Sequence, residues 1–369
     1  MNDTTQVLQR PEPTAPPTPT DGVPPTPRSR TRTRVLRVLG MAAGLGLLGY
    51  VLPRALGTTL TAIGHTLAAL PPTWVAGLLV LWAAGLVAHS FVLTAALPGL
   101  TTRRALTLNL TGSSVSNVVP FGGAAGMTLN YVMIRSWKAD TSAFAAFLLV
   151  SNIWDFMLKL ALPAVALIAL ILEGGVVSPG LRTVAVITAS VLGATVVALA
   201  VGIVSRRHAE AVTRPLVHLF AAVRRLLRGH ADPAALTHHV LEARDRVAEV
   251  VRRKWWQLSA GMVGYAVLQA LLLAACLTAV GNTFGIAAVL AAYAVERILT
   301  LAQITPGGTG ITEAGTAGVL IALGGDPTAV AAGVLLYRAI TYALEIPVGG
   351  AWLGGWLWAR RVRRTAGIA

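Results

Sequence analysis

Long apolar runs separated by short polar segments dominate the chain. A helix needs about 20 mostly apolar residues to cross the hydrocarbon core of a bilayer. Runs of this kind occur at 35–52, 73–97, 142–172, 181–204, 255–280 and 286–305, and further candidates lie around 315–323 and over 328–358. The stretch 56–70 ends at Pro71 and Pro72 and is typical of an interfacial helix. We therefore predict an all-α fold, a polytopic transmembrane helix bundle.

Proline and glycine interrupt two of the apolar segments. The interruptions contain Pro120, Gly122 and Gly126 in the first case, and Pro306, Gly307, Gly308 and Gly310 in the second. Broken backbone leaves N–H and C=O groups unpaired, which membrane depth tolerates only beside protein or a water-filled cavity. We predict that each interruption marks a re-entrant or broken pair of half-helices, and that the first pair, over 103–135, enters and leaves on one side.

Interruptions of this kind in both halves of a chain are typical of transporters. Such proteins contain an inverted repeat, and the substrate binds near the middle of the bilayer between the repeats. The pattern therefore predicts an inverted repeat around a cavity. The alternative is that the glycines only allow neighbouring helices to pack closely.

The composition excludes a water-soluble globule. Hydrophobic residues make up 55% and charged residues 12% of the chain, against about 25% charged residues in typical soluble proteins. The 30 Lys and Arg against 15 Asp and Glu give a formal charge of +15, which on a soluble chain would suggest nucleic-acid binding. The cations instead gather before the first apolar run, between Arg206 and Lys254, and after Trp358, as the positive-inside rule expects of cytoplasmic segments. We expect no nucleic-acid partner, and both termini in the cytoplasm.

Changes in polarity divide the chain along its length. Residues 1–34 form a tail rich in Pro and Thr, which we expect to be disordered in the cytoplasm. Two membrane halves, 35–204 and 255–358, flank a basic amphipathic segment, 205–254, which we expect to lie as a hairpin on anionic headgroups at the cytoplasmic surface. A basic tail, 359–369, follows. The excess of arginine over lysine indicates a GC-rich bacterial source and hence a bacterial inner-membrane location.

Charged residues inside predicted spans are costly and are functional candidates for that reason. The candidates are Asp155 with Lys159, Glu296 with Arg297, and Arg338 with Glu345. The first two residues are spaced i,i+4 and the last two lie two turns apart, so each of these pairs shares a helix face. One interpretation is that they bind a polar substrate in a cavity. The other is that they are mutually neutralising pairs that hold the bundle together.

Glu313 and several uncharged polar residues complete the candidate binding site. Glu313 follows the second interruption and has no adjacent cation, so it either favours the positive end of a helix dipole or binds a cationic group or a proton. Asn117, Asn130 and Tyr131 flank Pro120, and we expect them to line the same cavity unless they bond to neighbouring helices. Free N–H groups at half-helix ends suit an anionic group such as phosphate.

The sequence contains no established catalytic or cofactor signature. It has no HExxH, GxSxG or GxxxxGK[ST] motif, and its spans contain no cluster of His and acidic residues with the spacing of metal ligands. The single cysteine, Cys276, excludes an intrachain disulfide and a thiolate metal cluster. We therefore expect a protein that is not an enzyme and that needs no metal or cofactor.

A resemblance to a known family runs through 117–135, 151–160 and 296–315, with Tyr337 and Arg338 downstream. These segments are similar to those of the flippase-like integral membrane region of lysylphosphatidylglycerol synthases and its stand-alone relatives. The resemblance implies a role in moving or exposing polar lipids, such as aminoacylated phosphatidylglycerol or lipid-linked sugars, across the bilayer. The matching positions are Pro120, Gly122, Gly126, Asp155, Glu296, Pro306, Gly307, Gly308, Gly310, Glu313 and Arg338.

Two departures from the family pattern narrow this expectation. Many members carry an Arg and a Glu just after the first proline and glycine, where this chain has Gly123 and 125–127 without charge, so one charged headgroup contact is absent. Bifunctional relatives continue into a soluble aminoacyl-transferase domain, whereas this sequence ends at Ala369. We therefore expect that it is not the synthase itself.

The leading functional hypothesis is a lipid flippase or transporter-like protein that passes a polar headgroup through a cavity while the acyl tails stay in hydrocarbon. Its expected partners are a membrane phospholipid or lipid-linked substrate and anionic headgroups at the basic segments, with a homo-oligomer as a further option. One alternative is a non-transporting scaffold that recruits a partner through 206–254. Another is an intramembrane transferase of lipid-linked sugars, for which Asp155 and Glu296 are the available acids.

Overall fold

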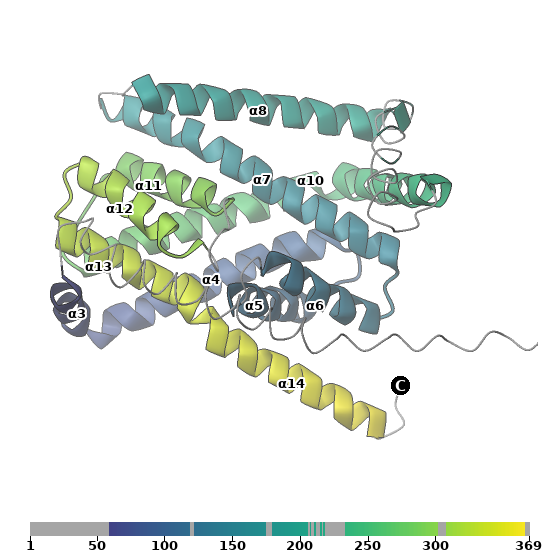
Figure 1. The fold of residues 1–369 in the computed structure, drawn as a ribbon, viewed down its shortest axis with the longest axis horizontal. Coiled ribbons are helices and arrows are strands. Elements are labelled where there is room, and N and C mark those ends of the chain that lie inside the picture. Colours follow the sequence, from purple (N-terminus) through teal and green to yellow (C-terminus); the bar gives the residue numbers. More distant parts are fainter. Residues whose placement is uncertain are drawn as a thin grey trace, which may run out of the picture.

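The computed structural model describes residues 59–118, 122–174, 179–205, 233–301 and 308–365, and a few positions between 205 and 233. The predicted tail over 1–34, the predicted helix over 35–52, Pro120, Pro306 and Gly307 lie outside the described residues. The described part of the chain forms helices and contains no strand, which confirms the all-α prediction. Its helices form an elongated bundle, and most of them run along its length (Figure 1).

Five helical segments among the described residues are long and apolar enough to cross a membrane, so the chain is a multi-pass membrane protein. They are α4 (Pro72–Ala96), α7 (Thr141–Leu172), α8 (Pro179–Val204), α10 (Pro233–Ala279) and a last span in which α13 (Pro327–Arg338), the π-helical turn η3 (Ala339–Ala343) and α14 (Glu345–Thr365) follow one another directly.

Local sequence sets the start of several spans. Pro72 is the first residue of α4, where a missing N–H costs nothing. At the starts of α7 and α13, the side chains of Asp140 and Asp326 accept the backbone N–H groups of Ala143 and Ala329, at 2.6 and 2.8 Å. Such N-caps satisfy donors that have no partner within the helix.

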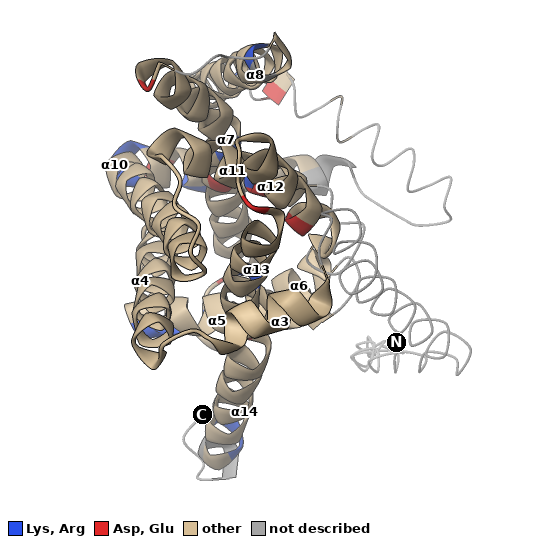
Figure 2. Ribbon diagram, turned by 90° about the vertical axis from the view of Figure 1, so that its left-hand side faces the viewer, with Lys and Arg blue, Asp and Glu red and all other residues tan. Residues whose placement is uncertain are grey.

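The short helix α3 (Leu60–Ala68) precedes the first described span. Thr59 caps it by accepting the N–H of Ala62 at 3.2 Å. Its buried Ile63 packs against α13. Helix α3 therefore places the described start of the chain beside α13, on the face of the bundle opposite α8 (Figures 1 and 2).

The first interruption separates two antiparallel half-helices, α5 (Thr102–Val118) and α6 (Gly123–Ser136). The guanidinium of Arg104, near the start of α5, lies 5.2 Å from the ring centre of Trp137, which follows α6. The free ends of the pair therefore lie together. Helices α5 and α6 form a hairpin that enters and leaves on one side of the bundle.

The second interruption separates a similar pair, α11 (Ile286–Leu299) and α12 (Ile311–Ala322). The 14 residues of α11 span about 21 Å, less than the roughly 30 Å of hydrocarbon in a bilayer. The prediction of a full span over 286–305 is therefore wrong, because the apolar run continues beyond the end of the helix. A Cβ on Gly325, just after α12, would lie 2.6 Å from the ring of Phe284, just before α11, so this hairpin also returns to the side from which it starts.

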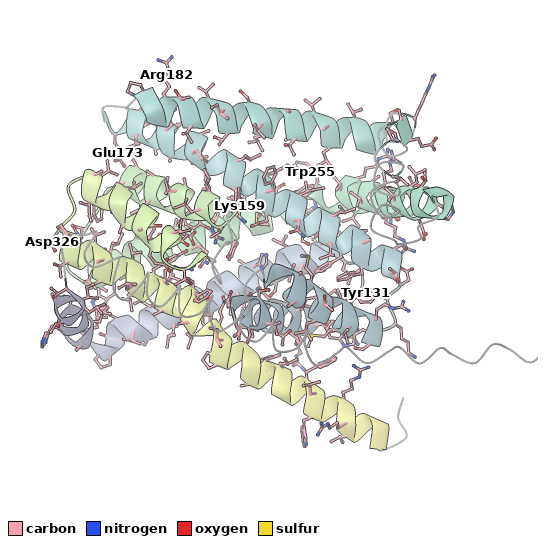
Figure 3. The ribbon with its side chains drawn as sticks, in the orientation of Figure 1. Tyr131, Lys159, Glu173, Arg182, Trp255 and Asp326 are labelled. Atoms are coloured by element: carbon pink, nitrogen blue, oxygen red, sulfur yellow. The ribbon has the colours of Figure 1, made fainter. Side chains whose placement is uncertain are left out.

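The two hairpins enter the bundle from opposite ends. Helix α7 connects these ends. At its start, the Thr141 hydroxyl lies 3.3 Å from that of Tyr131 in α6, whereas Glu173, at its far end, accepts the N–H of Ala287 in α11 at 3.0 Å. Figure 3 shows Tyr131 and Glu173 at opposite ends of the bundle.

Helix α10 is much longer than a bilayer is thick. Its 47 residues extend over about 70 Å. The helix runs without a break through Lys254, so the expected boundary between the basic segment 205–254 and the membrane helix 255–280 is not a helix end. The described second half of the basic segment is an extension of a span, because one continuous helix contains both.

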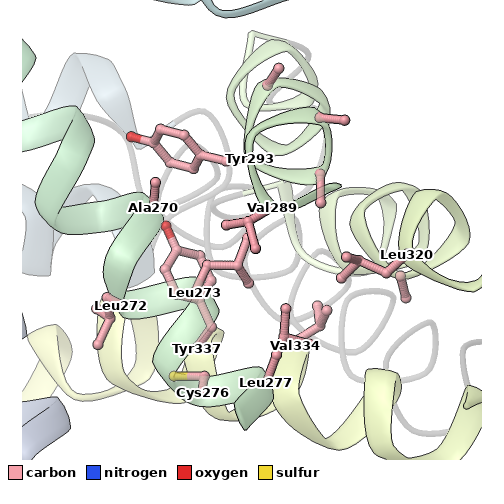
Figure 4. Packing of buried hydrophobic residues seen from close by; sticks show 14 of the residues in the cluster. Ala270, Leu272, Leu273, Cys276, Leu277, Val289, Tyr293, Leu320, Val334 and Tyr337 are labelled. Carbon is pink, nitrogen blue, oxygen red and sulfur yellow. The ribbon is translucent and has the colours of Figure 1, made fainter. Parts of the chain in front are cut away.

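The two larger apolar clusters occupy different halves of the bundle. One packs side chains of α10, α11, α12 and α13, among them Leu273, Tyr293 and Leu320 (Figure 4). The other packs side chains of α4, α5, α6, α7 and α10. Along α7, 144–154 belongs to the second cluster and 162–166 to the first. The charged residues of α7, Asp155 and Lys159, lie between these two stretches.

Candidate functional site

A cavity of about 420 Å³ lies in the middle of the bundle, between the two apolar clusters. Its walls come from both hairpins, from α4, α7 and α10, and from the last span. The predicted site residues that line it are Asn117, Gly126, Asn130, Asp155, Lys159, Glu296, Arg297, Arg338 and Glu345. The fold thus gathers polar residues from distant parts of the sequence around one space, and Figure 2 shows charged residues among α7, α11 and α12.

Helix α7 contributes an ion pair to the cavity wall. Lys159 Nζ lies 2.7 Å from Asp155 Oδ2, and the two side chains are 12% and 35% exposed. One turn further along lies Pro163. Because proline has no N–H, the carbonyl of Lys159 lacks its usual donor within the helix. Helix α7 is therefore polar in both side chains and backbone where it borders the cavity.

A second charged group connects α11, α12 and the last span. Arg297 Nε lies 2.7 Å from Glu296 Oε2, and the other carboxylate oxygen lies 3.8 Å from Arg338. Arg338 Nε in turn donates to Glu313 Oε1 at 2.8 Å. Both glutamates are 2% exposed. Mutual pairing stabilises these charges in an interior where an unpaired charge is expensive.

Glu313 joins this group to the tip of the second hairpin. Its second oxygen accepts the backbone N–H of Gly310 at 2.5 Å, at the N-cap of α12. Gly308 and Gly310 have φ angles of 70° and 90°, a conformation that costs other residues about 1–2 kcal/mol. Glu313 therefore caps a helix and also pairs with a cation, Arg338, that lies far from it in the sequence.

The π-helical turn η3 connects Arg338 to the first hairpin. The N–H of Leu344 donates to the carbonyl of Ala339, five residues earlier, at 2.8 Å, and turns of this type are frequent at functional sites. The Tyr342 hydroxyl donates to the carbonyl of Asn117 at 2.6 Å. The ring of Tyr342 lies 4.9 Å from the Arg338 guanidinium. Contacts therefore run from the second hairpin, through Arg338 and Tyr342, to the end of α5.

Glu345 lines the cavity, but it does not pair with Arg338 as its spacing predicted. In the described part of the chain, no cation lies within 4.0 Å of the Glu345 carboxylate. Both residues line the same cavity, but the Arg338 guanidinium is directed toward α11 and α12. Arg338 therefore meets Glu313 and Glu296 instead.

Uncharged polar side chains from α4 and α10 also line the cavity, and the sequence reasoning missed them. His89 and Gln269 are both in the wall. Each contacts Tyr265: the His89 ring lies 5.0 Å from the tyrosine ring, and Gln269 Nε2 donates to the tyrosine hydroxyl at 3.2 Å. The sequence feature that could have identified His89 and Gln269 is that each is a polar residue within an otherwise apolar run.

Some polar atoms of the cavity wall have no protein partner. Trp82 Nε1, Asn109 Nδ2 and Asn130 Oδ1 are buried without a hydrogen-bond partner among the described residues. All these side chains line the cavity. A buried polar atom is costly unless it is hydrogen-bonded, so the cavity wall presents hydrogen-bonding groups that the described protein atoms leave unused.

The sequence profile of one protein family matches residues 37–349, which is most of the chain. The family is described as the lysylphosphatidylglycerol synthase TM region. The chain belongs to this family. The resemblance noted in the sequence is thereby confirmed. A comparison with curated proteins finds no match.

The positions that match the lysylphosphatidylglycerol synthase TM family differ in where the structure places them. Asp155, Glu296 and Arg338 are in the cavity wall. The residues outside the wall are Gly122, Gly308, Gly310 and Glu313. Pro120, Pro306 and Gly307 lie outside the described residues. Glu296 of the second hairpin therefore borders the cavity, whereas Gly308, Gly310 and Glu313 of the same hairpin lie behind its wall.

Two further predicted site residues, Gly126 and Tyr131, pack against neighbouring residues of the bundle. A Cβ on Gly126 would collide with the Ser116 hydroxyl and with the carbonyl of Gly112, so Gly126 allows α5 and α6 to pack closely as well as lining the cavity. Tyr131 lies away from the cavity wall, near the open end of the hairpin, where its ring centre is 5.0 Å from that of Phe144.

Proposed function

We propose that this protein moves the polar headgroup of a lipid across the bilayer through the central cavity, as a flippase or lipid transporter. The observation that carries the proposal is a cavity of about 420 Å³, bordered by acidic and basic side chains, in the middle of a multi-pass membrane protein. Charged residues at that depth mark pathways for polar substrates. The volume lies at the small end of the range for ligand sites, about 300–1,000 Å³, so it suits a headgroup while the acyl tails stay in hydrocarbon.

The ion pairs offer both charges to such a headgroup. The side chains of Lys159 and Arg297 are 12% and 14% exposed and suit a phosphate. Asp155, which is 35% exposed, suits a cationic group. A headgroup that binds between these residues keeps each charge neutralised, which a low-dielectric interior requires. The substrate class is therefore a polar phospholipid or a lipid-linked headgroup.

The order of the helices supports a transport role. Span α4, the α5–α6 hairpin and span α7 are followed by span α10, the α11–α12 hairpin and the last span, and the hairpins enter from opposite ends (Figure 1). We propose that these two units, which α8 separates in the sequence, form an inverted repeat. Transporters with such repeats bind substrate where the repeats meet and expose it alternately to the two sides.

We further propose that the basic end of the bundle faces the cytoplasm of a bacterium. At this end Arg104 lies beside Trp137, Arg246 pairs with Asp140 at the start of α7, and Arg360 lies near the end of α14. Glu173 and Asp326 lie at the other end (Figure 3). The positive-inside rule orients the basic end toward the cytoplasm. A reporter fused to the C-terminus that is active only in the periplasm should therefore stay silent, and an active one contradicts this orientation.

Reconstitution tests the transport proposal. Purified protein is placed in liposomes that contain phosphatidylglycerol and aminoacylated phosphatidylglycerol, and headgroup exposure is followed with membrane-impermeant reagents. The double variant Asp155→Asn/Lys159→Met removes the cavity ion pair without leaving a lone charge, and we expect it to slow translocation at least about tenfold, the effect of about 1.4 kcal/mol.

The matched control removes an exposed ion pair of the same i,i+4 spacing. The variant Glu249→Gln/Arg253→Met removes the pair in α10 whose side chains are 62% and 76% exposed, and it should translocate lipid as the unaltered protein does. Equal rates for all three proteins contradict the assignment of the cavity. An unaltered protein that moves neither lipid contradicts the transport function.

A further inference from the structure

An apolar groove lies on the outer face of α7, next to the cavity. Its volume is about 410 Å³, and α7 and α8 supply its lining residues, which are Leu148, Leu149, Asn152, Ile153, Phe156 and Thr195. Leu148 and Asn152 also line the central cavity. The groove and the cavity therefore meet at these two residues of α7.

The residue pattern of α7 explains why a polar and an apolar space share this helix. The residues that face the cavity are Phe147, Leu148, Ser151, Asn152, Asp155 and Lys159, and those that face the groove are Leu148, Leu149, Asn152, Ile153 and Phe156. Residues four apart lie on the same helix face, so these positions form two adjacent stripes. Leu148 and Asn152 lie on the boundary between them.

We propose that this groove holds an acyl chain of the lipid whose headgroup occupies the cavity, so that the lipid enters sideways past Leu148 and Asn152. The inference rests on the proposed function and adds a second subsite to it. Among the residues that the structure describes, no charged one lines the groove. Thr195 uses its hydroxyl to donate to the carbonyl of Val191 at 2.8 Å, so it requires no polar group from a ligand.

The mouth of the groove combines exposed apolar side chains with one polar amide. This combination matches the region of a lipid where the acyl chains join the glycerol. Leu149 and Phe156 are 47% and 36% exposed, so the groove is open to surrounding lipid. Asn152 is exposed, and its Nδ2 donates to the carbonyl of Leu148 at 2.8 Å. This bond holds a polar amide at the boundary, where the glycerol and ester groups of a bound lipid would lie.

The position of the groove favours a lipid chain as its occupant. Because Leu148 and Asn152 line both the groove and the cavity, a chain attached to a headgroup in the cavity reaches the groove without crossing a helix.

A second apolar groove provides a matched control. It lies between α5 and α14, has a volume of about 590 Å³, and is lined by Thr107, Val348, Ala351, Trp352, Gly355 and Trp356. None of these residues lines the cavity. A Cβ on Gly355 would meet no atom within 4 Å, so a large side chain there can fill this groove without a clash at its first atom.

Groove-filling variants test the inference in the reconstituted system. Thr195→Trp should slow translocation of dipalmitoyl-phosphatidylglycerol about tenfold, equivalent to about 1.4 kcal/mol, and should leave a dihexanoyl analogue unaffected, because short chains do not need the groove. Gly355→Trp should change neither rate. Equal slowing of both lipids by Thr195→Trp, or no slowing, overturns the inference. A change in oligomeric state with unchanged translocation identifies a second copy of the chain as the occupant and also overturns it.

Photochemical labelling gives a readout that does not depend on transport. Phosphatidylglycerol with a diazirine in one acyl chain is added in equimolar amount to the purified protein in detergent and irradiated. Peptides containing Leu149 or Phe156 should be labelled several times more than peptides containing Trp352, and Asp155→Asn/Lys159→Met should abolish the difference. Equal labelling of both grooves overturns the inference even if the protein transports lipid, whereas absent transport with preferential labelling counts against the proposed function alone.

Discussion

Arg338 Nε donates a hydrogen bond to Glu313 Oε1 at 2.8 Å, across 25 residues of sequence. The side chains are 10% and 2% exposed. The contact joins α12 of the second hairpin to the last span, one residue before η3 begins. Because Glu313 also holds the N–H of Gly310, the position of the hairpin tip and the position of Arg338 in the cavity wall depend on each other.

Removing Arg338 should destabilise the protein strongly. Arg338→Met leaves the Glu313 and Glu296 carboxylates without this cation, and breaking a buried ion pair costs about 3–5 kcal/mol. Glu313→Gln should cost less, because its amide oxygen can still accept one hydrogen bond. Thermal unfolding in detergent measures both, with Arg253→Met as an exposed control. If Arg338→Met unfolds at the same temperature as Arg253→Met, the pair of Arg338 and Glu313 does not have this structural role.

The tip of the second hairpin should require glycine at Gly308 and Gly310. Alanine at either position should lower the free energy of unfolding by about 1–2 kcal/mol, because φ is positive there. A Cβ on Gly308 would also lie 2.8 Å from Thr312 Oγ1. Gly318→Ala is the control, because this helical glycine has open space around its Cβ. We expect lower thermal stability for the first two variants only. A similar effect of all three substitutions contradicts the conformational explanation.

Substitution of Gly126 should loosen the first hairpin. A methyl group there collides with Ser116 and with the carbonyl of Gly112, and overpacking costs about 1–3 kcal/mol. Gly77→Ala in α4 meets no atom within 4 Å and should be neutral or slightly stabilising. Hydrogen exchange across α5 and α6 measures the opening of the hairpin. If amide hydrogen exchange in α5 and α6 is unchanged in Gly126→Ala, α6 accommodates the methyl group without loss of stability, and the prediction is wrong.

Tyr342 should couple η3 to the end of α5. Tyr342→Phe removes the 2.6 Å hydrogen bond to the carbonyl of Asn117 and should cost about 1 kcal/mol. Tyr342→Leu also removes the ring beside Arg338 and should cost roughly 0.5–2 kcal/mol more. We expect faster amide exchange near the end of α5 in both variants. A larger loss of stability in Tyr342→Phe than in Tyr342→Leu contradicts this explanation.

Asp140 should make the start of α7 sensitive to acid. The backbone N–H of Ala143, with the Ser142 hydroxyl and Arg246, lowers the pKa of this carboxyl below its ordinary value. A lowered folded-state pKa stabilises the protein above the unfolded value of about 3.9, and this stabilisation is lost as the pH falls through the folded value. Nearby Glu242 shares Arg246 at 3.4 Å.

The comparison with Asp140→Asn isolates this effect. Asparagine keeps the helix cap but has no charge to titrate. The melting temperature of the unaltered protein should therefore fall more steeply than that of Asp140→Asn between about pH 5 and about pH 3. Parallel curves for the two proteins exclude Asp140 as a contributor.

Features that depend on neighbours along the chain follow from the sequence. Apolar runs of bilayer length predict the spans because each helix must satisfy its own backbone in hydrocarbon. The i,i+4 spacing predicts the ion pair between Asp155 and Lys159, which the structure shows at 2.7 Å. The two segments that combine proline with several glycines likewise mark the breaks between half-helices, whereas the single Pro163 lies within the continuous helix α7.

Only the tertiary structure decided which distant residues meet. The contact between Asn117 and Tyr342 joins positions 225 residues apart, and Arg338 pairs with Glu313 of another helix although Glu345 follows it on the same span. The short α11 turned an expected span into a hairpin, and the packing of α8 beside α7 created the apolar groove. Sequence spacing defines neighbours within one helix, whereas contacts between helices depend on the direction, depth and rotation that packing gives each of them.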